Sequence, residues 1–269
     1  MIKLEKSGLP LYLDEVVNIL AISAQLPFMG YSRKVAGRME GLWAGYVTDE
    51  DEPVYDVYRG FAFEKDKALL DKYNFRYDIT IVLPGDVDGE LKKTSGHYHG
   101  YDPEHANTYA EVYEVIKGTA LYVLQRADNF DTDPGNIKVT DVILATVHEG
   151  ETIIVPPNYG HCSINVGQGP LVFSNLAYGQ CPIVYDAVRN YRGMCYYVMK
   201  NNDGIMYQKN NLYKTLPEAK YADVRENPHL GIKFGLPVYH SFMENPDAFG
   251  FLGRPGQDLN AVMDMLIIR

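Results

Sequence analysis

The sequence has few cysteines and no long apolar run. Its three cysteines, Cys162, Cys181 and Cys195, are an odd number without paired C-x-x-C spacing, which argues against a disulfide framework and against a structural zinc site. No stretch approaches the roughly 18 apolar residues of a membrane-spanning helix. Charged residues and Pro10 interrupt the first residues, so we expect no signal peptide. These absences favour a cytoplasmic protein.

Basic charge is also scarce. The chain has 25 Lys and Arg against 35 Asp and Glu, which gives a net charge of -10 at pH 7. Such a field repels phosphate backbones, so we expect no nucleic-acid partner, and no membrane partner either. The hydrophobic content of 46% and the 22% of charged residues are typical of a globular protein, and 269 residues suffice for one main domain with appendages.

The middle of the chain has the pattern of an all-β protein. From Val54 to about Met199, short runs rich in Val, Ile, Tyr and Thr alternate with turns rich in Gly, Pro, Asn and Asp. Six or more strands at such intervals predict a sandwich or a barrel. The clearest predicted strands are residues 79–83, 111–116, 120–124, 152–155, 162–166 and 171–177.

Both ends of the chain predict helical extensions. Asp14 can cap a short helix over residues 14–25, and residues 216–227 and 259–268 have helical spacing of apolar side chains. We therefore divide the chain into an N-terminal arm (1–30), a barrel domain (31–211) and a C-terminal extension (212–269). The extension packs on the barrel or on a partner subunit, and the sequence favours neither.

Three histidines and one acid can form a metal site. His97 and His99 are two residues apart, so in a strand both rings point to the same face. Glu111 begins the next strand, and His161 follows a Pro- and Gly-containing turn. Three imidazole nitrogens and one carboxylate suit iron, manganese, nickel or zinc better than calcium or magnesium. The His-x-His spacing alone is more typical of two solvent-facing histidines on an exposed strand.

Two stretches of the chain resemble the conserved motifs of the cupin family, G-x5-H-x-H-x3,4-E-x6-G and G-x5-P-x-G-x2-H-x3-N. In the second motif Asn158 replaces the turn glycine, and in the first Leu91 stands where the motif opens with glycine, with Gly89 close by. The resemblance implies a cupin barrel, a double-stranded β-helix or jelly roll. The residues at the required spacings of the second motif are Gly150, Pro156, His161 and Asn165.

The acid of the first motif is open to two assignments. Eleven residues separate His99 from Glu111, more than the motif allows, whereas Glu104 lies at the nominal distance. Glu104 follows Pro103 in a loop-like run, but Glu111 begins a strand and has Gly118 seven residues on. We prefer Glu111 as the ligand.

Beyond these motifs, residues 33–211 resemble the cupin-type glucose-6-phosphate isomerases. The resemblance rests on segments such as Arg38-Met39-Glu40-Gly41, Thr94-Ser95-Gly96-His97-Tyr98-His99 and Glu111-Val112-Tyr113-Glu114-Val115. It implies the metal ligands named above and a sugar-phosphate pocket. The residues that it places in this pocket are Thr80, Thr94, Gly96, Tyr55, Tyr113 and Tyr178.

The resemblance also implies an activity. It predicts a homodimeric enzyme of glycolysis and gluconeogenesis that interconverts glucose 6-phosphate and fructose 6-phosphate. One divalent metal ion per chain is expected, with Fe²⁺ preferred over Mn²⁺, Ni²⁺ or Zn²⁺. Glu111 is our candidate for both ligand and catalytic base, with Tyr113 beside it; the reaction can pass through an enediolate or a hydride shift.

One feature of that family is missing. Where the family has a histidine six residues after the position of Tyr178, this chain has Val184, with Tyr185 beside it. The sugar could therefore differ, and a mannose or lyxose isomerase remains an alternative. An iron-dependent oxygenase and a non-catalytic sugar-binding protein are the other hypotheses, because a fold does not fix its chemistry.

Overall fold

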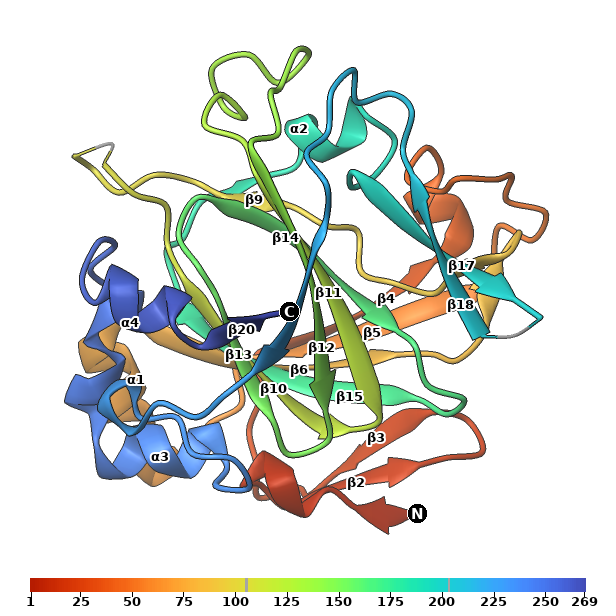
Figure 1. Cartoon of the computed structure of the whole chain (residues 1–269). Coiled ribbons are helices and arrows are strands. Elements are labelled where there is room, and N and C mark those ends of the chain that lie inside the picture. Colours follow the sequence, from red (N-terminus) through yellow and green to blue (C-terminus); the bar gives the residue numbers. More distant parts are fainter. Residues whose placement is uncertain (105, 203) are drawn as a thin grey trace.

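Two large β-sheets face each other in the computed structural model, which describes residues 1–104, 106–202 and 204–269 (Figure 1). The first sheet has six antiparallel strands in the order β13-β10-β15-β6-β5-β4. Its strands are β4 (Gly30–Val35), β5 (Pro53–Arg59), β6 (Phe75–Val82), β10 (Glu111–Lys117), β13 (Thr152–Val155) and β15 (Leu171–Tyr178).

The second sheet has five strands in the order β14-β11-β12-β19-β20, and only the pair β12 and β19 is parallel among the described residues. The segment that precedes β9 also runs beside β14, through bridges from Lys93 to Ile164 and from His97 to His161. The strands of this sheet are β11 (Thr119–Arg126), β12 (Asp141–His148), β14 (Tyr159–Asn165), β19 (Lys220–Val224) and β20 (Leu266–Ile268).

Three small sheets surround the barrel. β9 pairs with β16, a four-stranded sheet has the order β18-β17-β8-β7, and the N-terminal strands form the sheet β1-β2-β3. Their bounds are β1 (Ile2–Lys3), β2 (Leu11–Asp14), β3 (Ile19–Ile22), β7 (Asp86–Val87), β8 (Glu90–Leu91), β9 (Tyr98–His99), β16 (Ile183–Val184), β17 (Tyr196–Asn201) and β18 (Gly204–Lys209).

The predicted all-β fold class is confirmed. All six predicted strands are present, as β6, β10, β11, β13, β14 and β15. The two motif departures fit their turns as well. Gly89 has a φ of +85° in the turn between β7 and β8, and Asn158 has a φ of +70° before β14. Glycine and asparagine tolerate this left-handed conformation better than most residues.

Side-chain alternation divides the core into two layers. Along β6, Tyr77, Ile79 and Ile81 point away from the barrel and pack against the terminal segments, whereas Asp78 and Thr80 point into it. A six-stranded sheet buried on both faces requires apolar residues on the outer face too, and this explains the nearly continuous apolar runs. The inner face of the same sheet is thereby free to carry polar groups.

The predicted N-terminal helix is wrong. Residues 14–25 form the turn after β2 and then β3, which pair as an antiparallel hairpin. Leu11, Leu13 and Leu20 are buried in the outer core layer, so the packing follows the strand period rather than the helical one. Asn18, with a φ of +53°, makes the turn that a continuous helix would not allow.

The C-terminal prediction is partly wrong. Residues 216–227 contain the strand β19 instead of a helix, and residues 259–268 form a short helix followed by β20. Within the described part of the chain, no helix has the length and apolar content needed to cross a membrane. The α-helices are α1 (Lys67–Tyr73), α2 (Asp186–Arg189), α3 (Val238–Glu244) and α4 (Leu259–Met263), with 3-10 turns at Glu5–Ser7, Ala36–Met39, Glu64–Asp66, Pro228–Leu230 and Pro246–Leu252.

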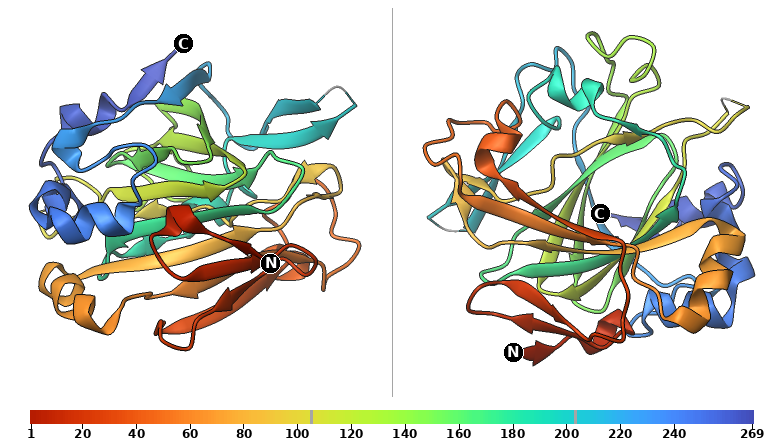
Figure 2. Two further views of the ribbon diagram at one scale, coloured as in Figure 1. Left: turned by 90° about the horizontal axis from the view of Figure 1, so that it is seen from below. Right: turned by 180° about the vertical axis from the view of Figure 1, so that it is seen from behind.

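The C-terminal helices α3 and α4 lie at one side of the barrel (Figure 2) and pack into the outer core layer of the six-stranded sheet, whereas β19 and β20 extend the second sheet. Tyr239 and Phe242 of α3 are buried in the outer core layer. The backbone N–H of Val238 donates a hydrogen bond of 3.0 Å to the Glu114 carboxylate on β10. Glu114 therefore faces away from the barrel interior, as the alternation along β10 predicts, and the extension packs on the barrel of its own chain.

Candidate metal centre

Strand pairing brings the three histidines together. His97 and His161 lie directly opposite each other on neighbouring strands, and each backbone N–H donates to the other's carbonyl, at 3.1 and 2.9 Å. His99 follows on β9, two residues along the same face. Glu111, the first residue of β10, approaches from the opposite sheet. The four side chains therefore meet between the two large sheets.

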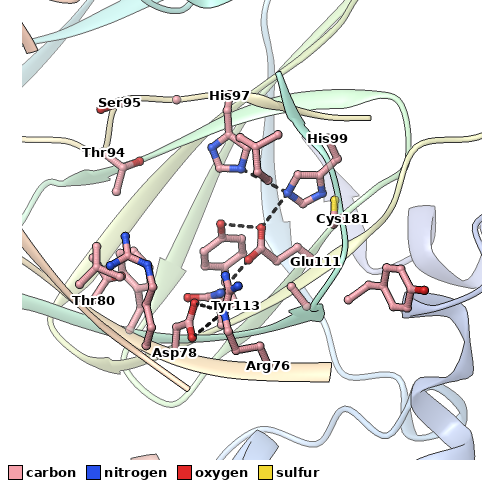
Figure 3. Close-up of a pocket in the computed structure, with 18 of the residues that line it drawn as sticks. Arg76, Asp78, Thr80, Thr94, Ser95, His97, His99, Glu111, Tyr113 and Cys181 are labelled. Carbon is pink, nitrogen blue, oxygen red and sulfur yellow. Dashed lines mark hydrogen bonds and ion pairs between the residues drawn. The ribbon is translucent and has the colours of Figure 1, made fainter. Parts of the chain in front are cut away.

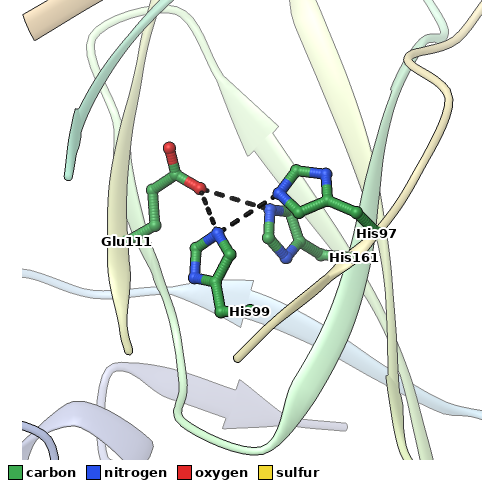
Figure 4. A group of neighbouring side chains, drawn as sticks. All are labelled: His97, His99, Glu111 and His161. Carbon is green, nitrogen blue, oxygen red and sulfur yellow. Dashed lines mark hydrogen bonds and ion pairs between the residues drawn. The ribbon is translucent and has the colours of Figure 1, made fainter. Parts of the chain in front are cut away.

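The four side chains converge on one point (Figure 4). Their ligand atoms all lie within 4.8 Å of one another. Oε2 of Glu111 is 3.1 Å from Nε2 of His99 and 3.4 Å from Nε2 of His161, and Nε2 of His97 is 3.2 Å from Nε2 of His99. Atoms bound to one ion at about 2.0–2.2 Å lie roughly 3–4 Å apart, so these separations suit a single transition-metal ion.

Neighbouring groups fix the orientation of the ligands. Nδ1 of His99 is 2.8 Å from the carbonyl oxygen of Tyr109, which leaves Nε2 to face the centre. The Asn175 side chain donates to Oε1 of Glu111 at 2.8 Å, and the Tyr113 hydroxyl donates to Oε2 at 2.8 Å. The same hydroxyl is 3.0 Å from Nε2 of His161.

Two members of the cluster, His97 and Glu111, have pKa shifts that favour the forms that coordinate a metal, whereas hydrogen bonds with Cys181 and Glu111 outweigh the effect of burial on His99 and raise its pKa. Burial, and then the charges of His161 and His99, hold the pKa of His97 well below its ordinary value. Burial alone would raise the pKa of Glu111, but the hydrogen bonds with His161 and His99 outweigh it and hold that pKa well below its ordinary value. A neutral His97 with its Nε2 aimed at the centre and an ionised carboxylate are the forms that coordinate a metal.

The group can therefore hold a divalent metal ion. The second candidate acid, Glu104, is exposed in a turn and does not belong to the cluster. The structure thus brings together His97, His99, Glu111 and His161, and it leaves Glu104 outside. The three cysteines are unpaired thiols, in agreement with the absence of a disulfide framework in the sequence.

A pocket opens in front of the metal centre (Figure 3). Its volume of about 290 Å³ is far larger than the space of one water molecule. Thr94 and Ser95 lie on the wall next to His97, and Arg76, Asp78 and Thr80 lie on the facing wall. A ligand in this pocket would contact the metal centre at one end and polar groups of both sheets at the other.

All predicted substrate residues line this pocket: Tyr55, Thr80, Thr94, Gly96, Tyr113 and Tyr178. The backbone N–H of Ser163 donates to the Thr94 hydroxyl oxygen at 3.0 Å, so the Thr94 proton is left to donate elsewhere. Tyr55 and Ser95 share a hydrogen bond of 3.1 Å. Gly96 has a φ of +75°, a conformation that favours glycine, and a Cβ there would lie 3.1 Å from the Met194 sulfur, so that side chain would have to shift.

Several pocket residues escaped the sequence analysis. They are Arg59, Arg76, Asp78, Asn175 and Tyr185. The strand period could have found three of them, because Asp78 and Arg76 lie two and four residues before Thr80 on β6, and Arg59 lies four residues after Tyr55 on β5. Asn175 carries no such signal, since its role depends on the pairing of β15 with β10.

Val184, at the position of the family's histidine, lies on β16 and does not line the pocket. On β16, Ile183 and the following Tyr185 line the pocket, whereas Val184 packs against the barrel core. The Tyr185 ring lies 5.7 Å from the His97 ring. An aromatic hydroxyl, rather than an imidazole, is therefore the polar group that this strand presents to the pocket.

The fold and the site define a barrel protein of the cupin class with one candidate mononuclear metal centre in its mouth. The model of the family described as "Glucose-6-phosphate isomerase (GPI)" matches residues 37–215, more than half of the chain. This chain belongs to the glucose-6-phosphate isomerase family. The match includes every predicted site residue.

Curated relatives agree with this assignment. The glucose-6-phosphate isomerase of Thermococcus onnurineus is 31% identical over 53% of this chain and 68% of its own length. That of Pyrococcus furiosus is 31% identical over 50% of this chain and 59% of its own length, and that of Thermococcus litoralis is 28% identical over 64% and 78%. Among solved structures, an oxalate oxidase has a TM-score of 0.34 at 19% identity, covering 53% of this chain and 59% of its own.

Proposed function

We propose that this protein is a metal-dependent aldose–ketose isomerase that interconverts glucose 6-phosphate and fructose 6-phosphate. The observation that carries the proposal is the group His97, His99, Glu111 and His161 at one end of a pocket lined by hydroxyl groups. Membership of the glucose-6-phosphate isomerase family supports the same reaction. The reaction belongs to glycolysis and gluconeogenesis.

The proposed metal supplies the electrophile. A divalent ion held by these four residues would polarise the sugar carbonyl and stabilise negative charge on the oxygens of C1 and C2. The Tyr109 carbonyl orients the His99 ring, and the bridge to His161 fixes the backbone of His97. We propose Fe²⁺ as the ion, because three imidazoles and one carboxylate suit it, with Mn²⁺, Ni²⁺ and Zn²⁺ as the alternatives.

Glu111 and Tyr113 are the proposed proton-transfer groups. Asn175 holds Oε1 of Glu111, so Oε2 faces the histidines and the Tyr113 hydroxyl. Coordination would lower the basicity of Glu111, and the adjacent Tyr113 hydroxyl can hold or return a proton at Oη. Proton transfer between C1 and C2 through an enediolate exchanges hydrogen with solvent, whereas a hydride shift does not.

Thr94, Ser95 and Gly96 are proposed to bind the phosphate group. A phosphate dianion is bound well by hydroxyls and by the backbone N–H groups of a turn, and this segment supplies both beside His97. Thr80 and Tyr55 line the same pocket. Tyr178, stacked on Tyr109 with ring centroids 4.9 Å apart, forms the proposed wall nearest the C-terminal extension.

We further propose a homodimer in the cytoplasm. Free thiols support a reducing compartment. The large side chains of Val16, Val17, Phe28, Met29 and Tyr31 are exposed in the N-terminal hairpin and at the edge strand β4, and a second copy of the chain could cover them. Light scattering of the purified protein would give the mass of the assembly.

A coupled assay tests the proposed function. The purified protein, stripped of metal and reloaded with Fe²⁺, should convert fructose 6-phosphate to glucose 6-phosphate faster than it converts mannose 6-phosphate or free lyxose. An oxygen electrode in the same reactions should record no consumption. Activity confined to an unphosphorylated or a different sugar, or oxygen uptake with turnover, would disprove the proposal.

A further inference from the structure

The basic residues of the pocket differ in how they are paired. Among the described lining residues only Arg59 and Arg76 are cationic. Nε of Arg76 donates to both carboxylate oxygens of Asp78, at 3.0 and 2.9 Å, and Asp78 is only 3% exposed. Arg76 is thereby neutralised within the wall. Arg59 forms no ion pair with any residue of the described ranges and makes one side-chain hydrogen bond, from Nη1 to the Ser32 hydroxyl at 2.9 Å.

The strand pairing positions Arg59 in the same pocket as the proposed phosphate-binding residues Thr94, Ser95 and Gly96. Tyr55, Val57 and Arg59 alternate along one face of β5 and all line the pocket. Val57 pairs with Thr80 and Tyr58 with Ile79 on β6, so Arg59, the next residue along β5, lies at the level of Asp78, two residues before Thr80. After Arg59 the Gly60 N–H donates to Asp78 at 2.8 Å, which fixes the end of β5 against β6.

We propose that Arg59 is a specificity-determining residue that binds the phosphate group of the sugar through its free guanidinium edge. This proposal rests on the proposed function and adds a residue to it. A dianion in a pocket whose other cation is already paired requires a counter-charge, and a guanidinium offers two parallel N–H donors to phosphate oxygens. Ser32 on β4 accepts from Nη1, and among the described residues the other guanidinium donors of Arg59, which lines the pocket, have no side-chain partner.

A neighbouring cleft is the competing location for the anion. It shares Tyr55, Ser95, Gly96 and Tyr185 with the main pocket. Its basic side chains are Lys34, Arg38 and Arg189. Arg38 is exposed and outside the main pocket, so Arg38→Gln removes the same charge as Arg59→Gln without touching the proposed site.

Steady-state kinetics of the two variants test the proposal. Arg59→Gln should lower kcat/KM for fructose 6-phosphate at least about tenfold, mainly through KM, and change the slow turnover of free fructose less than about twofold, because only the charged substrate loses a charge-assisted contact. Arg38→Gln should resemble the wild type. Equal losses with both sugars, or an equal loss in Arg38→Gln, would overturn the proposal.

A binding measurement separates this proposal from the proposed function. Calorimetric titration of the metal-loaded proteins with inorganic phosphate should give a dissociation constant at least about tenfold weaker in Arg59→Gln than in the wild type, and unchanged in Arg38→Gln. This result in a wild type without isomerase activity would support Arg59 and refute the function. Unweakened phosphate binding in an active enzyme would refute Arg59 alone.

The conservative variant Arg59→Lys provides a second test in case Arg59→Gln does not fold. It retains the charge but loses the fork of donors, so phosphate binding should be intermediate between the wild type and Arg59→Gln. If Arg59→Gln fails to fold, Arg59→Lys with wild-type thermal stability carries the test. Wild-type phosphate affinity in a folded Arg59→Lys would then count against guanidinium recognition.

Discussion

At the scale of single residues, two acids compete for one role, and their surroundings differ. Glu111 is 5% exposed with its carboxylate among three imidazoles, whereas Glu104 is exposed in a turn. Glu111→Gln should weaken metal binding and lower turnover at least about 100-fold, the size expected when a general base is lost. Glu104→Gln should leave both nearly unchanged. Elemental analysis and the coupled assay measure the two effects, and the opposite ranking would show that the ligand assignment is wrong.

The histidines provide a second residue-scale prediction. His97→Ala, His99→Ala and His161→Ala each remove one proposed ligand, so each should weaken metal binding at least about tenfold. His148, which is exposed at the end of β12, provides the matched control. Full metal occupancy in all three variants, determined by mass spectrometry under competition with a chelator, would refute the site.

Isotope exchange distinguishes the two mechanisms at the same residues. If Glu111 and Tyr113 transfer the proton, product formed in deuterated water should carry solvent deuterium at C1 or C2, as mass spectrometry would detect. Product without solvent deuterium at early conversion would favour the hydride shift. In that case Glu111→Gln should recover most of its turnover once metal is saturating.

Residue types and spacing predicted the metal group but not the whole pocket. His97 and His99 could be paired from their separation, and the motif resemblance added His161. Asn175 could not be predicted, because it contacts Glu111 only through the register between β15 and β10. Arg76 and Asp78 form an ion pair in the pocket wall. In the sequence they are two polar residues of a strand, with nothing to distinguish them from solvent-facing side chains.

At the scale of secondary structure, the wrong predictions are short segments whose apolar residues fit either the helical period of about 3.6 residues or the strand period of two. Residues 14–25 and 216–227 have apolar residues at helical spacing, yet β3 and β19 extend existing sheets. Pairing with β2 and with β12 supplies backbone partners that a short isolated helix would have to form alone. The strands of the barrel were predictable because their turns are marked by Gly, Pro, Asn and Asp.

The contact between β10 and α3 predicts a pH dependence of stability. Burial raises the pKa of Glu114 to about 8, although the Val238 N–H opposes the shift. A carboxyl whose folded pKa is raised contributes stability below its ordinary value of 4.5 that is lost as the pH rises through about 8. From pH 5 to 8 the free energy of unfolding should fall by up to about 1.4 kcal/mol per pH unit through this group.

Glu114→Gln keeps an oxygen for the Val238 N–H and cannot titrate. Denaturant unfolding of the wild type and of Glu114→Gln between pH 5 and 9 should therefore show a difference in stability that grows in favour of the variant as the pH rises. Parallel pH profiles of the two proteins would mean that Glu114 has an ordinary pKa in the folded chain.

At the scale of the whole molecule, metal binding and folding are linked. The proposed ligands come from both large sheets, so an ion bound only by the folded barrel stabilises it by mass action, about 2.7 kcal/mol at 100 times the dissociation constant. Adding Fe²⁺ under anaerobic conditions to the stripped protein should raise Tm by roughly 5–10 °C. His161→Ala should show a much smaller shift in the same calorimetric scan.

Because His97 and His161 lie opposite each other on neighbouring strands, a bound ion would affect the order of events in unfolding. A bound ion that joins them would tie the intervening chain, which contains β10, β11, β12 and β13, into a closed ring. Such a ring restricts the unfolded chain much as a covalent cross-link would, because the closed segment loses conformational entropy. Release of the ion would then have to precede separation of the strands. The rate of metal release would therefore limit the rate at which proteases cut the metal-loaded protein.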